Sequence, residues 1–284
     1  MKLLVPAVLM GLICGIIIFA FRRPKEKTGL ADEDQMEGDE DTNHEITISE
    51  VPYLVNGQTS LGLLSFPNKP EKKCPVVIVV PEWWGLTDFT KKQAIRLAKQ
   101  GYVAFVVDLY GNGVIASNPE EARHLSDGFY KNPKLAALNI NQAITLSRTL
   151  SVADESKAAV IGYCFGGSMA LSFANLGNKV DGVVSFHSGL KIVPPGNGMS
   201  AAVLVCHGDN DIFVPAETVR NFKKQMDDAG VNYRFISYPG ATHSFTNPDA
   251  TEMGKRFSIP IEYNEEAAQT SWNDMITFFN QIFH

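Results

Sequence analysis

A cysteine between closely spaced glycines carries the clearest chemical signal in this sequence. Cys164 lies in residues 162–167, which read GYCFGG and separate an apolar run from a segment with helical spacing. This is the GxSxG spacing of a nucleophile elbow with cysteine in place of serine. So tight a turn crowds its flanking residues, which explains Gly162 and Gly166. A helix N-terminus there favours the thiolate, and the Phe165 N–H would face a developing oxyanion. The alternative is a small, buried, inert cysteine.

Two later apolar runs end in residues that complete a catalytic triad. Residues 202–206 precede Asp209 and Asp211, and residues 233–238 precede His243. The chain order is therefore nucleophile, acid, base, in which the carboxylate orients an imidazole that takes and returns the proton. We assign Asp211 as the acid because a helical segment follows it closely, and we expect Asp209 to bind loop amides. A hydrogen-bonded structural histidine is the alternative for His243.

The run at residues 76–80 ends in PEWWG, where a second oxyanion donor is expected. The Trp83 N–H is our candidate. The carboxylate of Glu82 would oppose a thiolate by repulsion unless it binds the thiol, and a loop carboxylate is the alternative. Other side chains at the strand ends are candidates for a substrate pocket, although aromatic residues there suit a core equally well. These are Trp84, Tyr110, His187 and Phe245.

Neither a metal nor a cofactor is expected. Cys206, His207, Asp209 and His187 are suitable ligand types, but no HxH or HxxxH pair offers two ligands from one element. Cys206 ends an apolar run and is expected to pack. The sequence has no GxGxxG or GxxxxGK[ST] motif and no CxxC pair. A formal charge of −6 provides no basic surface for nucleic acid.

Alternating strands and helices must position these residues. An opening hairpin is expected from residues 46–51 and 59–66 across the Asn56-Gly57 turn signal. Apolar runs typical of buried parallel strands follow at residues 76–80, 103–107, 158–161, 180–186, 202–206 and 233–238. Helical spacing separates or follows them at residues 88–100, 133–150, 168–176, 216–229 and 265–282. The pattern predicts an α/β fold: a mostly parallel central sheet with helices on both faces and ligands at the carboxyl ends of its strands.

Between these elements, residues 111–132 form the longest irregular stretch of the domain and predict a loop or cap over that edge of the sheet.

The 284 residues divide into three parts: a hydrophobic segment (1–23), an acidic tether (24–45) and one globular domain (46–284). Residues 3–21 carry no charge and are long enough to approach the roughly 30 Å of a bilayer core. They predict a retained membrane anchor, with a cleaved signal peptide or a buried helix as alternatives. The tether holds eight acidic residues between Asp32 and Glu45 and cannot bury enough apolar surface to fold.

The sequence leaves open which side of the membrane holds the domain. The basic residues directly after the anchor favour the cytoplasmic side, whereas short leaders with polar tethers are common on exported enzymes.

Five motifs in this order resemble the dienelactone hydrolases, over about residues 46–284. They are PEWWG at 81–85, DLY at 108–110, GYCFGG at 162–167, HGDND at 207–211 and HSF at 243–245. The resemblance implies an α/β-hydrolase fold with a Cys-His-Asp triad. It also implies a neutral resting thiol held by Glu82, which takes the thiol proton when substrate binds. An acyl-enzyme on Cys164 would then be released by water with His243 as base.

Two arginines of the family's namesakes, which bind a substrate carboxylate, are absent here. Their places read Gly111-Asn112 and Asn247, and asparagine cannot pair bidentately with a carboxylate. Arg123 could supply a cation from the cap segment, or simply face water. The sequence therefore predicts hydrolysis of a neutral, small-molecule ester or lactone. The alternatives are a thioesterase or an acyl or glycan esterase on the same fold, and a binding or scaffold protein that kept the fold. The oligomeric state is not indicated.

Overall fold

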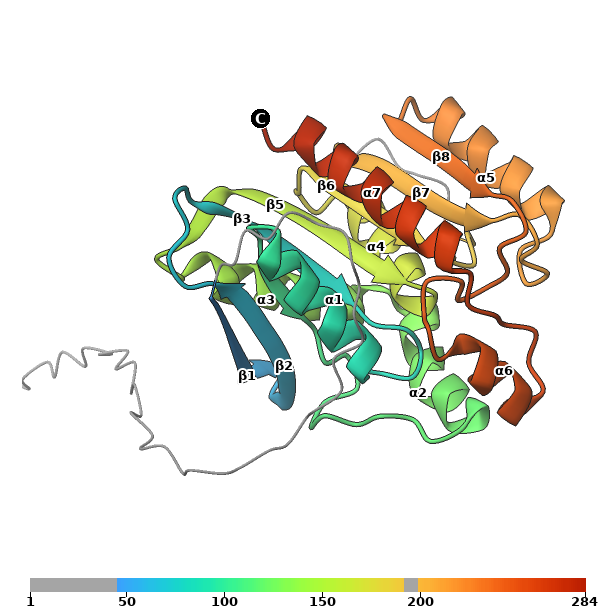
Figure 1. Cartoon of the computed structure of the whole chain (residues 1–284), viewed down its shortest axis with the longest axis horizontal. Coiled ribbons are helices and arrows are strands. Elements are labelled where there is room, and N and C mark those ends of the chain that lie inside the picture. The colour runs from blue at the N-terminus through green and yellow to red at the C-terminus, as the bar shows by residue number, and fades with distance from the viewer. Residues whose placement is uncertain (1–44, 192–198) are drawn as a thin grey trace, which may run out of the picture. The chain divides into compact units, whose positions relative to one another are not determined.

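One mixed sheet forms the centre of the part of the chain that the structure describes (Figure 1). The computed structural model describes residues 45–191 and 199–284. Its strands are β1 (Ile46–Val55), β2 (Gln58–Pro67), β3 (Cys74–Val80), β4 (Val103–Val106), β5 (Ala153–Tyr163), β6 (Gly182–Phe186), β7 (Ala202–Gly208) and β8 (Tyr233–Tyr238). Their order is β1-β2-β4-β3-β5-β6-β7-β8. β2 pairs antiparallel with β1 and β4, and the other neighbours are parallel, which confirms the mostly parallel sheet.

The opening hairpin has the turn that its sequence predicts. Asn56 and Gly57 have φ angles of 51° and 80°, and the register pairs Val55 with Gln58. Two consecutive positive φ angles are the signature of a type I′ turn, whose twist matches that of the strands it joins. The hairpin forms one edge of the sheet, with β1 outermost and β2 paired with β4.

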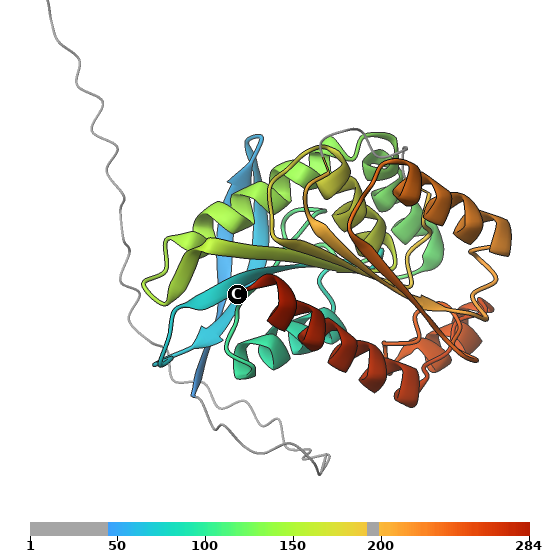
Figure 2. The ribbon, with the colours of Figure 1, turned by 90° about the horizontal axis from the view of Figure 1, so that it is seen from above.

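Helices cover both faces of the sheet, as expected. They are α1 (Asp88–Lys99), α2 (Pro119–Lys131), α3 (Lys134–Arg148), α4 (Phe165–Asn175), α5 (Ala216–Asp228), α6 (Ala250–Phe257) and α7 (Glu265–Ile282). α1 and α7 lie on one face, and α3, α4 and α5 lie on the other (Figure 2). Strand β3 shows the alternation that this requires, because Ile78 packs with the α3 and α4 side and Val77 and Val79 pack with the α1 and α7 side.

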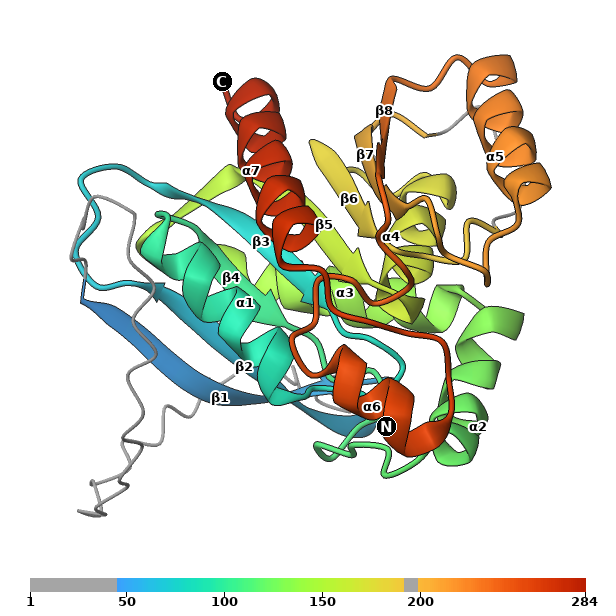
Figure 3. The ribbon, with the colours of Figure 1, turned by 45° about the vertical axis from the view of Figure 1, so that its right-hand side comes forward.

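Residues 111–132, expected to form a loop or cap over the carboxyl edge of the sheet, contain the helix α2, so the segment is not a loop throughout. The Asn118 side chain accepts a hydrogen bond from the Glu121 N–H at 3.0 Å, and Pro119 occupies the first turn. Both are ordinary signals of a helix start that the sequence offered. The helix α6 was also not predicted. α2 and α6 lie together beyond the carboxyl ends of the strands (Figure 3), where Trp84 packs with Ala122 of α2 and stacks on Phe257 of α6.

The predicted membrane segment at residues 3–21 and the tether up to residue 44 lie outside the described residues. Within residues 45–191 and 199–284, no helix has the length and apolar character needed to cross a bilayer.

Candidate active site

The elbow, residues 162–167, joins β5 to α4 at the carboxyl edge of the sheet. Cys164 has φ 53° and ψ −115°, an unfavourable conformation for a residue with a Cβ, and it immediately precedes the first residue of α4. A Cβ on Gly162 would lie 2.1 Å from the Gly166 carbonyl oxygen, and one on Gly166 would lie 2.2 Å from the Val80 carbonyl oxygen. The close packing predicted for both glycines is confirmed, because neither position has room for a Cβ.

Cys164, His243 and Asp211 form a continuous hydrogen-bonded chain. The Cys164 Sγ lies 3.0 Å from Nε2 of His243, and Nδ1 of His243 lies 2.7 Å from Oδ2 of Asp211. The other carboxylate oxygen of Asp211 accepts the Phe213 N–H at 2.9 Å. Asp209 lies apart and accepts the Gly240 N–H at 2.7 Å, as expected for a carboxylate that binds loop amides. Nucleophile, base and acid therefore meet, although they come from three different strand ends.

The electrostatics of the triad favour a charged histidine. Burial alone lowers the pKa of His243, but the negative charge of Cys164 and the carboxylate of Asp211 outweigh burial and raise that pKa well above its ordinary value. The Asp211 side chain is fully buried and the His243 side chain is 12% exposed, so little water screens the interaction. The contacts of His243 therefore stabilise its imidazolium form.

The hydrogen bonds of Glu82 and of the Cys164 thiol differ from those that the family resemblance implies. Its Oε2 accepts a hydrogen bond from the Asn247 side-chain amide at 2.8 Å, whereas the thiol of Cys164 lies against His243. Glu82 is 1% exposed, and burial raises the pKa of its carboxyl, against the opposing effect of the Asn247 hydrogen bond. The transfer of the thiol proton to Glu82 when substrate binds stays a prediction.

The two predicted oxyanion donors follow two neighbouring strands, β5 and β3. Phe165 is the first residue of α4, where a backbone N–H has no acceptor within its own helix. Trp83 follows β3, and its carbonyl accepts a hydrogen bond from the Tyr110 hydroxyl at 2.7 Å. The Tyr110 ring also stacks on Phe165 at a centroid distance of 6.3 Å. Tyr110 thus contacts both segments that carry the predicted donors.

The remaining candidates divide between the core and the surface. Phe245 is completely buried and Trp84 is 4% exposed, so both belong to the packing behind the site. Arg123 is exposed on α2, and within the described residues its guanidinium makes no hydrogen bond or ion pair with the triad. His187 is completely buried and binds the backbone of Cys164, so it lies behind the nucleophile and does not line an open pocket.

Sequence reasoning missed two aromatic residues beside the triad. The Phe213 ring meets the His243 ring edge-to-face at 5.3 Å and is 47% exposed. Tyr130, 51% exposed at the end of α2, packs edge-to-face on Phe165 at 5.3 Å. The position of Phe213 two residues after the acid was a usable signal. No sequence signal pointed to Tyr130, because the helix that carries it was not predicted.

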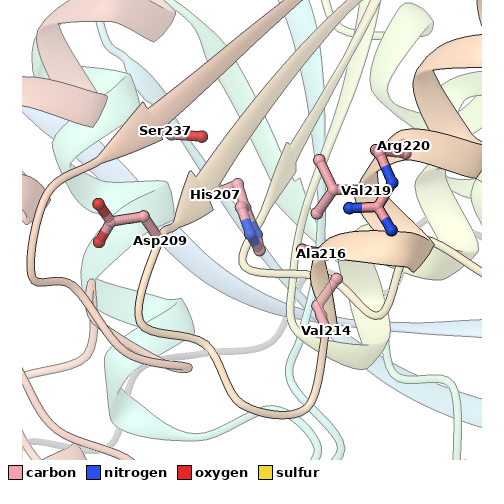
Figure 4. A pocket seen from close by; sticks show the side chains of 7 residues that line it. All are labelled: His207, Asp209, Val214, Ala216, Val219, Arg220 and Ser237. Carbon is pink, nitrogen blue, oxygen red and sulfur yellow. The ribbon is translucent and has the colours of Figure 1, made fainter.

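A separate cavity of about 280 Å³ lies between the ends of β7 and β8 and the start of α5 (Figure 4). Its lining includes His207, Asp209 and Arg220 but no member of the triad. Burial lowers the pKa of His207, and that ring packs against Phe235. Within the described residues, no group of three or more His, Cys, Asp or Glu side chains is placed to hold a metal.

Comparison with known proteins agrees with this geometry. The family model described as "Dienelactone hydrolase family" matches residues 61–283. Protein usf of Aquifex pyrophilus is 28% identical, over 81% of this chain and 97% of its own length. A putative carboxymethylenebutenolidase of Yersinia pestis is 26% identical, over 84% of this chain and 90% of its own. The crystal structure of a dienelactone hydrolase-like promiscuous phosphotriesterase from metagenomic libraries aligns with a TM-score of 0.77 and 28% identity, covering 84% of this chain and 98% of that one.

Proposed function

Because the chain belongs to the dienelactone hydrolase family, we propose that it hydrolyses neutral carboxylic esters or lactones through an acyl-enzyme on Cys164. The observation that carries this proposal is the chain of contacts from Cys164 through His243 to Asp211, at 3.0 and 2.7 Å. A nucleophile, a base within hydrogen-bond reach and a group that orients the base are the requirements of acyl transfer.

The residues divide the reaction into two halves. The Cys164 thiolate attacks the ester carbonyl carbon, and the resulting oxyanion is bound by the N–H groups of Phe165 and Trp83. The C–O bond breaks, and the leaving alkoxide takes the proton from the His243 imidazolium. A water molecule then gives a proton to the neutral His243 and attacks the thioester carbon. The acid product leaves as the thiolate–imidazolium pair is restored.

The pairing of Asn247 with Glu82 supports a neutral substrate. The amide binds a buried acidic group, so neither side chain offers a cation to a substrate carboxylate. Glu82 itself would repel such an anion in its charged form. A carboxylate on the substrate would therefore lose its water without gaining an ion pair.

We expect a carboxylated lactone to be turned over with a kcat/KM no higher than that of its methyl ester. A bidentate arginine would favour the acid by roughly 10- to 100-fold, which is the value of a charge-assisted hydrogen bond or two. Steady-state kinetics on the matched pair measure the ratio. A strong preference for the acid that disappears in Arg123→Ala would contradict the proposal and assign the missing cation to α2.

The same fold could act on other acyl compounds. Comparing the turnover of nitrophenyl acetate, a simple lactone and an acyl-CoA separates an esterase from a thioesterase, because all three deliver an acyl group to the same sulfur. An acyl-CoA hydrolysed with a kcat/KM far above the other two would favour the thioesterase. No turnover of any of them, with Cys164 accessible to alkylation, would favour a binding protein that kept the fold.

We also propose that residues 3–21 anchor the domain to a membrane and that residues 24–45 act as the tether. The support is the uncharged length of the first segment and the acidity of the second. We expect the full chain to sediment with membranes and resist carbonate extraction, and the chain lacking residues 1–45 to remain in the supernatant. A soluble full chain would contradict the anchor. N-terminal sequencing tests cleavage, and protease treatment of intact cells tests which side the domain faces.

A further inference from the structure

A second histidine lies directly behind the nucleophile. His187 follows β6, is completely buried, and adopts a φ of 39°, which costs a residue with a Cβ of the order of 1–3 kcal/mol. Its backbone N–H donates to the Cys206 carbonyl at 2.8 Å, which ties the strained residue to the end of β7. Such strain persists only where the surroundings hold it, so the position of this ring is tightly determined.

The contacts of the ring fix its tautomer. The backbone N–H of Cys164 lies 3.1 Å from Nδ1 of His187 and also donates to the Phe186 carbonyl at 2.9 Å. A backbone N–H can only donate, so Nδ1 is the unprotonated nitrogen. The ring proton is therefore on Nε2, which lies 2.8 Å from the Thr246 Oγ1 and donates to it. Burial, reinforced by the charge of His243, holds the pKa of His187 well below its ordinary value and so keeps the ring neutral.

These two hydrogen bonds link the backbone of the nucleophile to the loop that carries the base. Cys164 is the nucleophile in the elbow, and Thr246 lies three residues after the base in the loop that carries His243. The His187 ring also packs edge-to-face on the rings of His243 and Phe245, at 5.5 and 5.3 Å. The ring thus touches the elbow backbone, the base and the loop of the base, but it is shielded from any substrate.

We propose that His187 is a positioning residue, whose neutral ring sets the separation of Cys164 and His243 by bridging the elbow backbone to Thr246. The inference rests on the proposed cysteine mechanism, because the separation matters only if the sulfur and the imidazole exchange a proton. Misplacement by about 1 Å is enough to cost roughly 10²-fold in rate.

Four variants test the bridge. His187→Phe keeps the bulk and removes both hydrogen bonds. His187→Asn can keep an acceptor near the place of Nδ1, and Thr246→Val removes the other end. His207→Phe is the matched control, because His207 is also a buried histidine near the end of a neighbouring strand, and its Nδ1 has no hydrogen-bond partner among the described residues.

We expect His187→Phe to lower kcat by roughly 10²-fold with KM within about threefold, because substrate contacts are unchanged. Alkylation of Cys164 by iodoacetamide should become slower, and its pH curve should move to higher pH as the imidazolium contact loosens. His187→Asn should recover part of both effects, Thr246→Val should show a smaller loss of the same kind, and His207→Phe should stay within about threefold of the wild type.

Alkylation needs no ester, so it tests the bridge even if the proposed hydrolysis fails. The proposal is overturned if folded His187→Phe keeps the wild-type kcat and alkylation curve, or if His207→Phe loses as much. Circular dichroism and the unfolding midpoint establish folding. If His187→Phe does not fold, an unchanged kcat and alkylation curve in Thr246→Val overturns the proposal in its place.

Discussion

Replacing Cys164 with alanine is expected to lower kcat for ester hydrolysis by at least about 10³-fold, because it removes the thiol that forms the acyl-enzyme. The residual rate would come from the oxyanion donors and binding alone. The thiol lies 3.0 Å from the His243 Nε2, so alanine leaves a base without a nucleophile. Hydrolysis of nitrophenyl acetate measures the loss. A burst of nitrophenol from the wild type and none from the variant would identify the acyl-enzyme step.

The other described cysteines provide the control. Burial raises the pKa of the Cys206 thiol to about 12 and also raises that of Cys74, so neither should react with iodoacetamide near neutral pH. Cys74 begins β3, at the opposite end of the sheet from the elbow, and Cys74→Ala should keep the wild-type kcat. Alkylation mapped by mass spectrometry should label Cys164 in the wild type and in Cys74→Ala. Hydrolysis that survives in Cys164→Ala would refute the cysteine mechanism.

The sequence predicted the triad because each of its members lies within a few residues of a strand's carboxyl end. Parallel strands bring their carboxyl ends to one edge of the sheet, so a residue a few positions beyond each end must lie near that edge. The helical segment that follows Asp211 closely distinguished it from Asp209, and the contacts of the two carboxylates with His243 and Gly240 agree. Local rules were sufficient here because short turns leave little conformational freedom between the strand and the functional residue.

The contacts of Glu82, Asn247 and His187 could not be predicted in the same way. The Glu82–Asn247 pair joins residues 165 positions apart, and the choice between amide and thiol as partner of the carboxylate depends on side-chain orientation. His187 was expected at the pocket, but its two hydrogen bonds depend on a positive φ angle, which the sequence around His187 does not predict. Such contacts depend on which of several side chains, brought together by the fold, binds a given group best. Neither motif spacing nor secondary-structure propensity contains this information.

Replacing Asp211 with asparagine is expected to lower kcat by about 10⁴-fold at neutral pH, although the side chains have the same shape. An amide placed with its NH₂ toward Nδ1 of His243 would force the ring proton onto Nε2, which faces the sulfur at 3.0 Å. The imidazole could then no longer accept the thiol proton. Asp209→Asn is the control two residues earlier, and it should stay within about threefold because the Asp209 carboxylate accepts the Gly240 N–H of a loop.

The pH dependence separates this mechanism from simple disruption of the loop. The Asp211 carboxylate helps to raise the pKa of His243, so removing its charge lowers that pKa and the imidazolium is lost at lower pH. An alkyl ester needs the imidazolium proton for its alkoxide leaving group, so the alkaline limb of kcat/KM should move to lower pH in Asp211→Asn. A nitrophenyl ester, whose leaving group needs no proton, should show a smaller displacement. Equal displacements for both esters would contradict His243 as the acid, and an unmoved limb would contradict its coupling to Asp211.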